Sequence, residues 1–379
     1  MNPLKNELNG NVPTRQQYKN WMAPVSKMYS KICWNHTVQH FQCNAVNMNS
    51  AVIKARKILT QFPTDNFKYC FCYGSGVFKQ ANYKSTSSMI DLVFVVNNSS
   101  NFHEDNMLQR PGHYSALKYL GPNAITKFQE QWGAKVYYNT LLYYAPEDIT
   151  YKYGVITRDD FVNDLLDWCH LYVAGRLHKP VAVLHECSDD DLLIALRNNL
   201  FSAIHVTLLS LPENFTEDEF YQTIANISYG GDFRMWVGED KNKVKNIVLP
   251  QIEYFRELYS NVISSLTDFL YIPDNAISVN CQQNMSPEAR WHHLNNLPRV
   301  PQRQLVRYFN KLGRVRRDTE EVLQTMSYHP DIGVPLNNII RKIVWKSSIR
   351  QSLKGIVTAG FMKSVRYSGR KLYKSLFSL

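Results

Sequence analysis

Apolar positions in the first half of the chain form short runs that are typical of β-strands, with helical spacing between them. The β-type runs cover residues 69–73, 89–96, 136–144 and 152–157. Apolar residues recur three to four positions apart at 51–61, 114–119 and 124–133, which predicts helices. Because strands and helices alternate, we expect a layered α/β or α+β fold built on a mixed sheet.

The pattern becomes helical after Asp159. Helical spacing covers residues 159–174, 189–211, 216–227, 244–268 and part of 287–311. Thr216 is followed three residues later by Glu219, a capping box that predicts a helix start. We therefore expect four regions: a basic leader at 1–50, an α/β domain at 51–188, a helical domain at 189–330, and a basic C-terminal region at 331–379.

The stretch 68–96 carries the most distinctive chemistry. Its first apolar run ends in Gly74-Ser75-Gly76, and its second contains one acid, Asp91. A carboxylate inside an apolar strand costs several kcal/mol unless it is paired, and a divalent metal is a usual partner. A lone Gly-Ser-Gly is typical of a simple tight turn. A hairpin would bring it next to Asp91, so that the loop holds a triphosphate and the carboxylate holds Mg²⁺, as in nucleotidyltransferases.

The overall charge predicts an anionic partner. The net charge is +11 and the pI is about 9.2, which suits a nucleotide, a nucleic acid or an anionic membrane surface. The sequence contains no run of 18 apolar residues, so we expect no transmembrane helix. Its seven cysteines are irregularly spaced, which argues against a disulfide framework and fits a reducing compartment.

Both ends of the chain are basic. The leader at 1–50 has Glu7 as its one acid, and either a mitochondrial presequence or a disordered basic arm explains it. No acid follows Asp331, whereas ten basic residues do. In 361–379 apolar residues recur three to four apart with cations between them, which predicts an amphipathic helix on anionic lipid. A helix docked on an acidic partner or a nucleic acid is the alternative. RNA recognition favours aromatic residues on a sheet face; the tyrosines do not cluster in this way, so no nucleic-acid partner is expected.

Several segments together resemble a known family. They are YGSGVFKQ at 73–80 with the run at 89–96, HYSALKYLG at 113–121, GAKVYYN at 133–139, KYGVI at 152–156, LYVAGRLHKPV at 171–181, SYGGDFRMWVGEDK at 228–241 and SSIRQSLKGIVTAG at 347–360. In this order they resemble the mitochondrial translocator assembly and maintenance proteins, which are phosphatidate cytidylyltransferases, also called CDP-diacylglycerol synthases. The resemblance covers roughly residues 50–360.

The resemblance implies a fold, a reaction and a location. It implies a nucleotidyltransferase-fold domain, a winged-helix-like helical domain and a membrane-associating C-terminal segment. The implied reaction converts CTP and phosphatidic acid to CDP-diacylglycerol and pyrophosphate with Mg²⁺, peripherally on the matrix side of the mitochondrial inner membrane, to supply cardiolipin synthesis. A non-catalytic, membrane-peripheral assembly factor for protein translocation is the alternative. A nucleotidyltransferase acting on nucleic acid is a third possibility.

The metal site predicted around Asp91 is incomplete. The nucleotidyltransferase superfamily usually has an Asp-x-Asp pair at this point, but Val93 replaces the second acid, as in the family that the chain resembles. The candidate helper is Asp232, in a Gly-Gly-Asp-Phe-Arg turn that also displays Arg234 as a phosphate-binding fork. An ordinary turn closed by a local ion pair explains the same residues.

The remaining candidates are phosphate and nucleotide contacts. We expect Gly74, Ser75, Gly76, Gln80 and Lys179 to bind the nucleotide, although Lys179 also suits a charge at a helix C-terminus. Arg350 and Lys354 are candidates for binding phosphate together with Arg234, and a basic helix lying on a membrane explains them equally well. Asp91 and Asp232 are the predicted catalytic residues, with Asp91 as the metal ligand.

Overall fold

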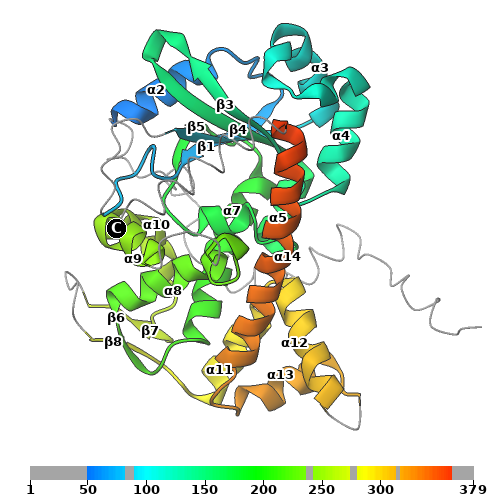
Figure 1. The fold of residues 1–379 in the computed structure, drawn as a ribbon. Helices are drawn as coiled ribbons and strands as arrows, with labels where there is room; N and C mark the ends of the chain where they lie inside the picture. The colour runs from blue at the N-terminus through cyan, green and yellow to red at the C-terminus, as the bar shows by residue number, and fades with distance from the viewer. Residues whose placement is uncertain (1–48, 82–88, 236–241, 274–279, 313–315, 361–379) are drawn as a thin grey trace, which may run out of the picture. The chain divides into compact units, whose positions relative to one another are not determined.

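The computed structural model describes residues 49–81, 89–235, 242–273, 280–312 and 316–360. The leader up to residue 48 and the tail at 361–379, with its expected amphipathic helix, lie outside the described residues. A five-stranded sheet has the order β3-β4-β2-β1-β5 (Figure 1). Its strands are β1 (Phe67–Tyr73), β2 (Ile90–Val96), β3 (Tyr137–Tyr144), β4 (Ile149–Thr157) and β5 (Ala182–His185). β2 and β4 are parallel and the other neighbours antiparallel, which confirms a mixed sheet in an α/β protein.

The two faces of β2 have different surroundings. Leu92, Phe94 and Val96 lie in an apolar cluster with residues of helix α2 (Ser50–Leu59). Because side chains alternate along a strand, Asp91 lies on the opposite face. Its partner in the antiparallel register is Tyr73, the last residue of β1. One face of β2 therefore packs in the apolar core, and the other face presents Asp91 near the beginning of the strand.

Helices surround the sheet and form most of the second half of the chain. Those that accompany the sheet are α2, α3 (Ser99–Gln109), α4 (Pro122–Gln131), α5 (Arg158–Asp167) and α6 (Ala174–Leu177), with the 3₁₀ turns η3 (Pro111–His113), η4 (Ala116–Leu120) and η5 (Ala145–Glu147). The later ones are α7 (Asp190–Leu208), α8 (Glu217–Tyr229), α9 (Lys243–Val248), α10 (Ile252–Ile263), α11 (Pro287–Asn295), α12 (Arg299–Leu312), α13 (Thr319–Ser327) and α14 (Gly333–Ala359), with η6 (Phe233–Met235) and η7 (Leu249–Gln251). The predicted capping box at the start of α8 is confirmed.

Some elements differ from the prediction. The helix predicted at 244–268 is divided into α9, η7 and α10 around Pro250, which has no backbone N–H to continue a helix. α3 was missed because its sequence is mostly polar, and β5 because it has only four residues. A second, three-stranded sheet was also missed. It has the order β6-β8-β7, formed by β6 (Asn214–Thr216), β7 (Leu270–Tyr271) and β8 (Asn280–Gln283).

Helix α14 connects the helical part of the chain to the large sheet (Figure 1). It buries apolar residues such as Leu336 and Ile340. Near its end, the Gln351 side chain accepts from Ala134 N at 2.9 Å and donates to Val136 O at 3.0 Å, just before β3. Much of the region predicted to associate with a membrane is thus an internal part of the fold. None of the described helices combines the length and the apolar character needed to span a bilayer.

A buried carboxylate explains why the helix predicted at 159–174 ends early. Asp164 on α5 accepts hydrogen bonds from five consecutive backbone N–H groups, those of residues 170–174, at 2.8–3.2 Å. Trp168 and Leu171 have positive φ angles of 54° and 52°, which turn the chain out of the helix. The carboxylate fixes this turn, and the turn leads directly into α6.

Replacing Asp164 with alanine should lower the free energy of unfolding by at least about 3 kcal/mol. Five amides would lose their acceptor, and each buried unsatisfied group costs about 1–3 kcal/mol. Urea denaturation measures the change. Asp159→Ala on the same helix is the control, because this largely exposed acid makes an ion pair worth about 0–1 kcal/mol. Equal stability of the two variants would contradict the role of Asp164.

Candidate functional site

The glycine loop turns closely over the start of β2, next to Asp91. Gly74 has φ +84°, and a Cβ added to it would lie 3.1 Å from Asp91 Oδ2. A Cβ on Gly76 would lie 2.3 Å from the Met89 carbonyl oxygen, so only glycine fits. The Gly74 carbonyl accepts from Val77 N and Phe78 N at 3.0 and 2.9 Å, with Ser75 inside the same turn. The predicted hairpin and the proximity of loop and acid are confirmed.

Lys152 lies beside Asp91 on the neighbouring strand. The parallel register of β2 and β4 pairs the two residues directly, and Lys152 Nζ is 3.1 Å from Asp91 Oδ1. The contact is an ion pair without hydrogen-bond alignment, since this oxygen has no hydrogen-bond partner among the described residues. Lys152 Nζ also lies 5.8 Å from the centre of the Tyr138 ring on β3. The sheet thus presents an acid and a cation together.

Arg176 and Tyr172 extend this site beyond the sheet. The guanidinium of Arg176, on α6, lies 3.9 Å from the centre of the Tyr172 ring and 5.4 Å from that of Tyr73. Arg176 Nε is buried and has no hydrogen-bond acceptor in the described part of the chain. Burial would raise the pKa of the Tyr172 hydroxyl, but the charges of Arg176, Arg234 and Lys152 lower it below its usual range. The positive charges of three side chains therefore act on one tyrosine hydroxyl.

Asp232 and Arg234 form an ion pair within one turn. Arg234 Nε lies 2.9 and 3.1 Å from the two carboxylate oxygens, and Arg234 N donates to Oδ1 at 3.0 Å. Burial would raise the pKa of Asp232, but hydrogen bonds from Arg234 and the charges of Arg234 and Arg176 lower it. The local ion pair, which was the alternative interpretation of this turn, is present. The positive charge of Arg176, on α6, also acts on this carboxylate.

Lys179 lies at the end of α6, behind Arg176. Its Nζ donates to Ser228 Oγ at 2.8 Å and to the Gly175 carbonyl, which is how a cation satisfies a helix C-terminus. Burial and the charge of Arg176 lower its pKa to about 7. The charge of Arg176 thus acts on Lys179, whereas the described hydrogen bonds of Lys179 are made to α6 and α8.

Three other candidates do not join these residues. Gln80 Oε1 accepts from Lys243 Nζ at 3.2 Å, beside α9. Arg350 is exposed on α14, and its role in phosphate binding stays a prediction. Lys354 is buried, and its Nζ donates to the carbonyls of Gln129 and Trp132 at 2.8 and 2.9 Å, at the end of α4. Its ammonium supports the fold, which does not support the predicted phosphate contact.

The sequence interpretation missed Lys152, Tyr172 and Arg176. Lys152 begins a predicted strand, but its place opposite Asp91 depends on strand order, which the local pattern does not reveal. Tyr172 and Arg176 both lie in the segment 171–181, and an arginine among apolar residues was the available signal. Chemically, the site combines a backbone loop, two paired carboxylates and a surplus of cations, which suits a polyphosphate ligand.

Replacing Gly76 with alanine should destabilise the protein by roughly 1–3 kcal/mol, the usual cost of overpacking. The new Cβ would overlap the Met89 carbonyl, and a backbone atom cannot turn aside as a side chain can. Thermal and urea denaturation measure the effect. Gly112→Ala is the matched control, because a Cβ there meets no atom within 4 Å. An unchanged Gly76→Ala variant would refute the close contact between loop and strand.

Comparison with known proteins agrees with the resemblance seen in the sequence. The family model described as "Phosphatidate cytidylyltransferase, mitochondrial" matches residues 55–374. A protein of that name from Danio rerio is 44% identical over 329 residues, which cover 86% of this chain and 95% of the relative. The protein of that name from Xenopus laevis is 43% identical, over 86% of this chain and 95% of the relative. The one from Drosophila melanogaster is 41% identical, over 84% of this chain and 98% of the relative. The chain therefore belongs to the mitochondrial phosphatidate cytidylyltransferase family.

Proposed function

We propose that this protein is a mitochondrial phosphatidate cytidylyltransferase, which makes CDP-diacylglycerol and pyrophosphate from CTP and phosphatidic acid. The observation that carries this function is the family match, which extends over residues 55–374 and includes both the glycine loop and the Asp232 turn. The product would supply cardiolipin synthesis.

We assign the large sheet to the nucleotidyltransferase fold. A glycine loop after β1 and an acid on the adjacent β2 support this assignment, because they place a phosphate-binding backbone next to a carboxylate. The small sheet β6-β8-β7, with β6 in contact with helix α8, supports a winged-helix-like second part.

Arg176 is the residue that most directly suggests a phosphate ligand. A buried donor without an acceptor costs about 1–3 kcal/mol, and Arg176 Nε is in this state. Lys152 and Arg234 add positive charge near the same tyrosine, so an anion is the favourable partner. We assign the triphosphate of CTP or the phosphate of phosphatidic acid to this place, with the Gly74–Gly76 backbone holding the triphosphate.

The residues present fit Mg²⁺ at Asp91. Asp91 Oδ1 has no hydrogen-bond partner among the described residues, and Oδ2 faces the glycine loop. Mg²⁺ is commonly held by one or two carboxylates together with substrate phosphates, so a single acid is sufficient. When bound, the ion would neutralise charge on the triphosphate. Asp232 is committed to Arg234, so we propose that it positions this arginine.

The reaction needs positioning more than proton transfer. An oxygen of the phosphatidic acid phosphate bonds to the α-phosphorus of CTP, and the bond from this phosphorus to the bridging oxygen of pyrophosphate breaks. The attacking phosphate is already ionised near neutral pH, so no strong general base is required. The cations bring two polyanions together, and the loop aligns the α-phosphorus with the attacking oxygen.

We propose that the protein attaches peripherally to the matrix side of the inner membrane, and the end of α14 supports attachment to a membrane surface. Ser115 Oγ donates to the Val357 carbonyl at 3.2 Å, which places this end beside η4. Exposed large apolar side chains gather on these elements and at the end of α4: Tyr119, Leu120, Trp132, Leu353, Ile356 and Val357. We propose that this apolar patch faces the lipid, next to the point where the basic segment 361–379 begins.

Asp91→Asn should lower turnover by at least about 100-fold with the fold intact, because a neutral amide binds Mg²⁺ and orients phosphate poorly. Turnover is measured as pyrophosphate release from CTP in the presence of Mg²⁺ and phosphatidic acid vesicles. A parallel assay offers an RNA primer as the acceptor in place of phosphatidic acid. Asp148→Asn, at an exposed acid before β4, is the control. Near-normal turnover of Asp91→Asn would refute the metal site, and no product from the wild type would favour the non-catalytic assembly factor.

A double change, Leu353→Ser with Val357→Ser, should weaken binding to vesicles containing phosphatidic acid by at least about fivefold. This corresponds to losing roughly 1 kcal/mol of apolar burial in the lipid. Co-sedimentation measures it. Tyr328→Ser, at an exposed aromatic residue after α13, is the control. If both variants bind like the wild type, the patch does not face the membrane.

A further inference from the structure

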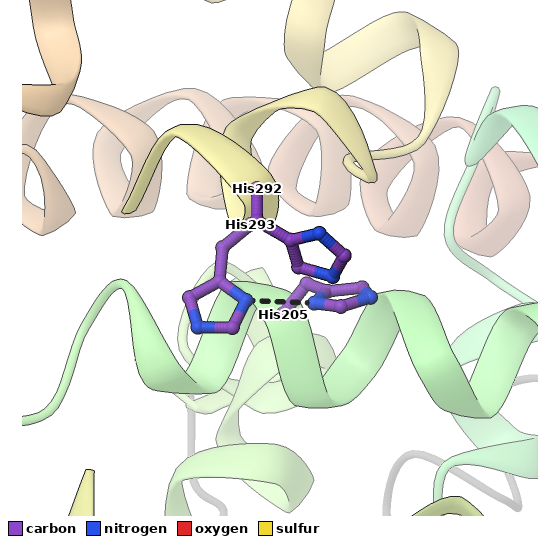
Figure 2. Close-up of side chains that lie close together, drawn as sticks. All are labelled: His205, His292 and His293. Atoms are coloured by element: carbon purple, nitrogen blue, oxygen red, sulfur yellow. Dashed lines mark hydrogen bonds between the residues drawn. The ribbon is translucent and has the colours of Figure 1, made fainter. Parts of the chain in front are cut away.

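Three histidines converge between α7 and α11, away from the residues described above. His205 is buried on α7, and His292 and His293 are consecutive on α11. Figure 2 shows the three rings directed toward one another from the two helices. One ring nitrogen of each lies within 4.8 Å of those of the other two. No other group of three potential metal ligands is this close in the part of the chain that the structure describes.

We propose that His205, His292 and His293 bind one Zn²⁺ ion that joins α7 to α11. His205 Nδ1 and His293 Nδ1 are 2.9 Å apart. In a tetrahedral zinc site with Zn–N bonds of about 2.0–2.1 Å, ligand nitrogens lie about 3.3 Å apart. Small side-chain rotations therefore suffice to accommodate the ion. The proposal does not depend on the function proposed above.

The donor type selects zinc over magnesium. Imidazole nitrogen suits Zn²⁺ and related transition metals, whereas Mg²⁺ prefers oxygen. His205 Nδ1 and His293 Nδ1 are within hydrogen-bond distance, so one of these nitrogens donates and the other accepts. The accepting nitrogen carries a lone pair, which is what a metal ligand needs.

The surroundings hold the rings and leave a route for the ion. The Phe269 ring stacks on His292 with centroids 4.4 Å apart, which fixes its orientation. His292 is only partly buried, so the ion and a water as fourth ligand reach the cluster from its side.

The first test measures metal on the full chain without a histidine tag. After incubation with Zn²⁺ and dialysis, we expect one zinc per chain by elemental analysis and a higher melting temperature than with a chelator. Co²⁺ should give visible bands of tetrahedral intensity without thiolate charge-transfer bands, which excludes binding by cysteines. A wild type that retains no zinc under these conditions would overturn the proposal without depending on any variant.

Variants then locate the ion. His292→Ala, at the partly exposed ligand, should weaken zinc binding by more than about 100-fold, because loss of a ligand costs more than the ~10–100-fold lost when a residue that only supports a ligand is removed. It should also abolish the zinc-dependent shift in melting temperature. His329→Gln is the matched control, because it removes an exposed histidine outside the cluster. If His292→Ala, folded by circular dichroism, still binds one zinc with wild-type affinity, the ion lies elsewhere and the cluster serves packing alone.

Discussion

The Asp164 carboxylate accepts hydrogen bonds from five successive amides, so the chain after α5 has only one path open to it. That path includes two residues with positive φ and ends at α6, which carries Arg176. The turn also places Tyr172 under the guanidinium. A buried acid without catalytic contacts thus positions a cation of the site. Backbone amides hold the Asp164 carboxylate more rigidly than a side-chain partner would, because an amide has no rotamer freedom of its own.

Each of the two acids of the site is paired with a cation, and Arg176 is in neither pair. Asp91 pairs with Lys152, and Asp232 with Arg234, so four charges largely cancel. Arg176 instead lies against the faces of two aromatic rings and donates one hydrogen bond to the Tyr172 carbonyl. Such a site can be stable without a ligand and still attract a polyanion, because cation–π contacts offset part of the charge while leaving hydrogen-bond donors unused.

The features that could be predicted from the sequence are those that depend on residues close together in the chain. The glycine loop and Asp91 lie within one hairpin, so their proximity followed from local pattern, as did most strands and the capped helix α8. Lys152 was missed because a parallel pairing joins strands that are distant in the chain. The contacts of Lys354 were not predicted because a charge in the sequence does not reveal the carbonyl groups of Gln129 and Trp132 to which it donates. The histidine cluster depends in the same way on the packing of two distant helices.

The pairing of β2 with β4 has a consequence for how the family's sequences can change in length. Asp91 faces Lys152 through backbone register alone, with seven aligned residue pairs from Ile90 to Val96. Insertion or deletion of one residue within either strand would move the acid or the lysine to the opposite face of the sheet. A change in length within either strand would therefore separate the acid from the lysine, whereas a change in the connections outside the strands would leave their pairing intact.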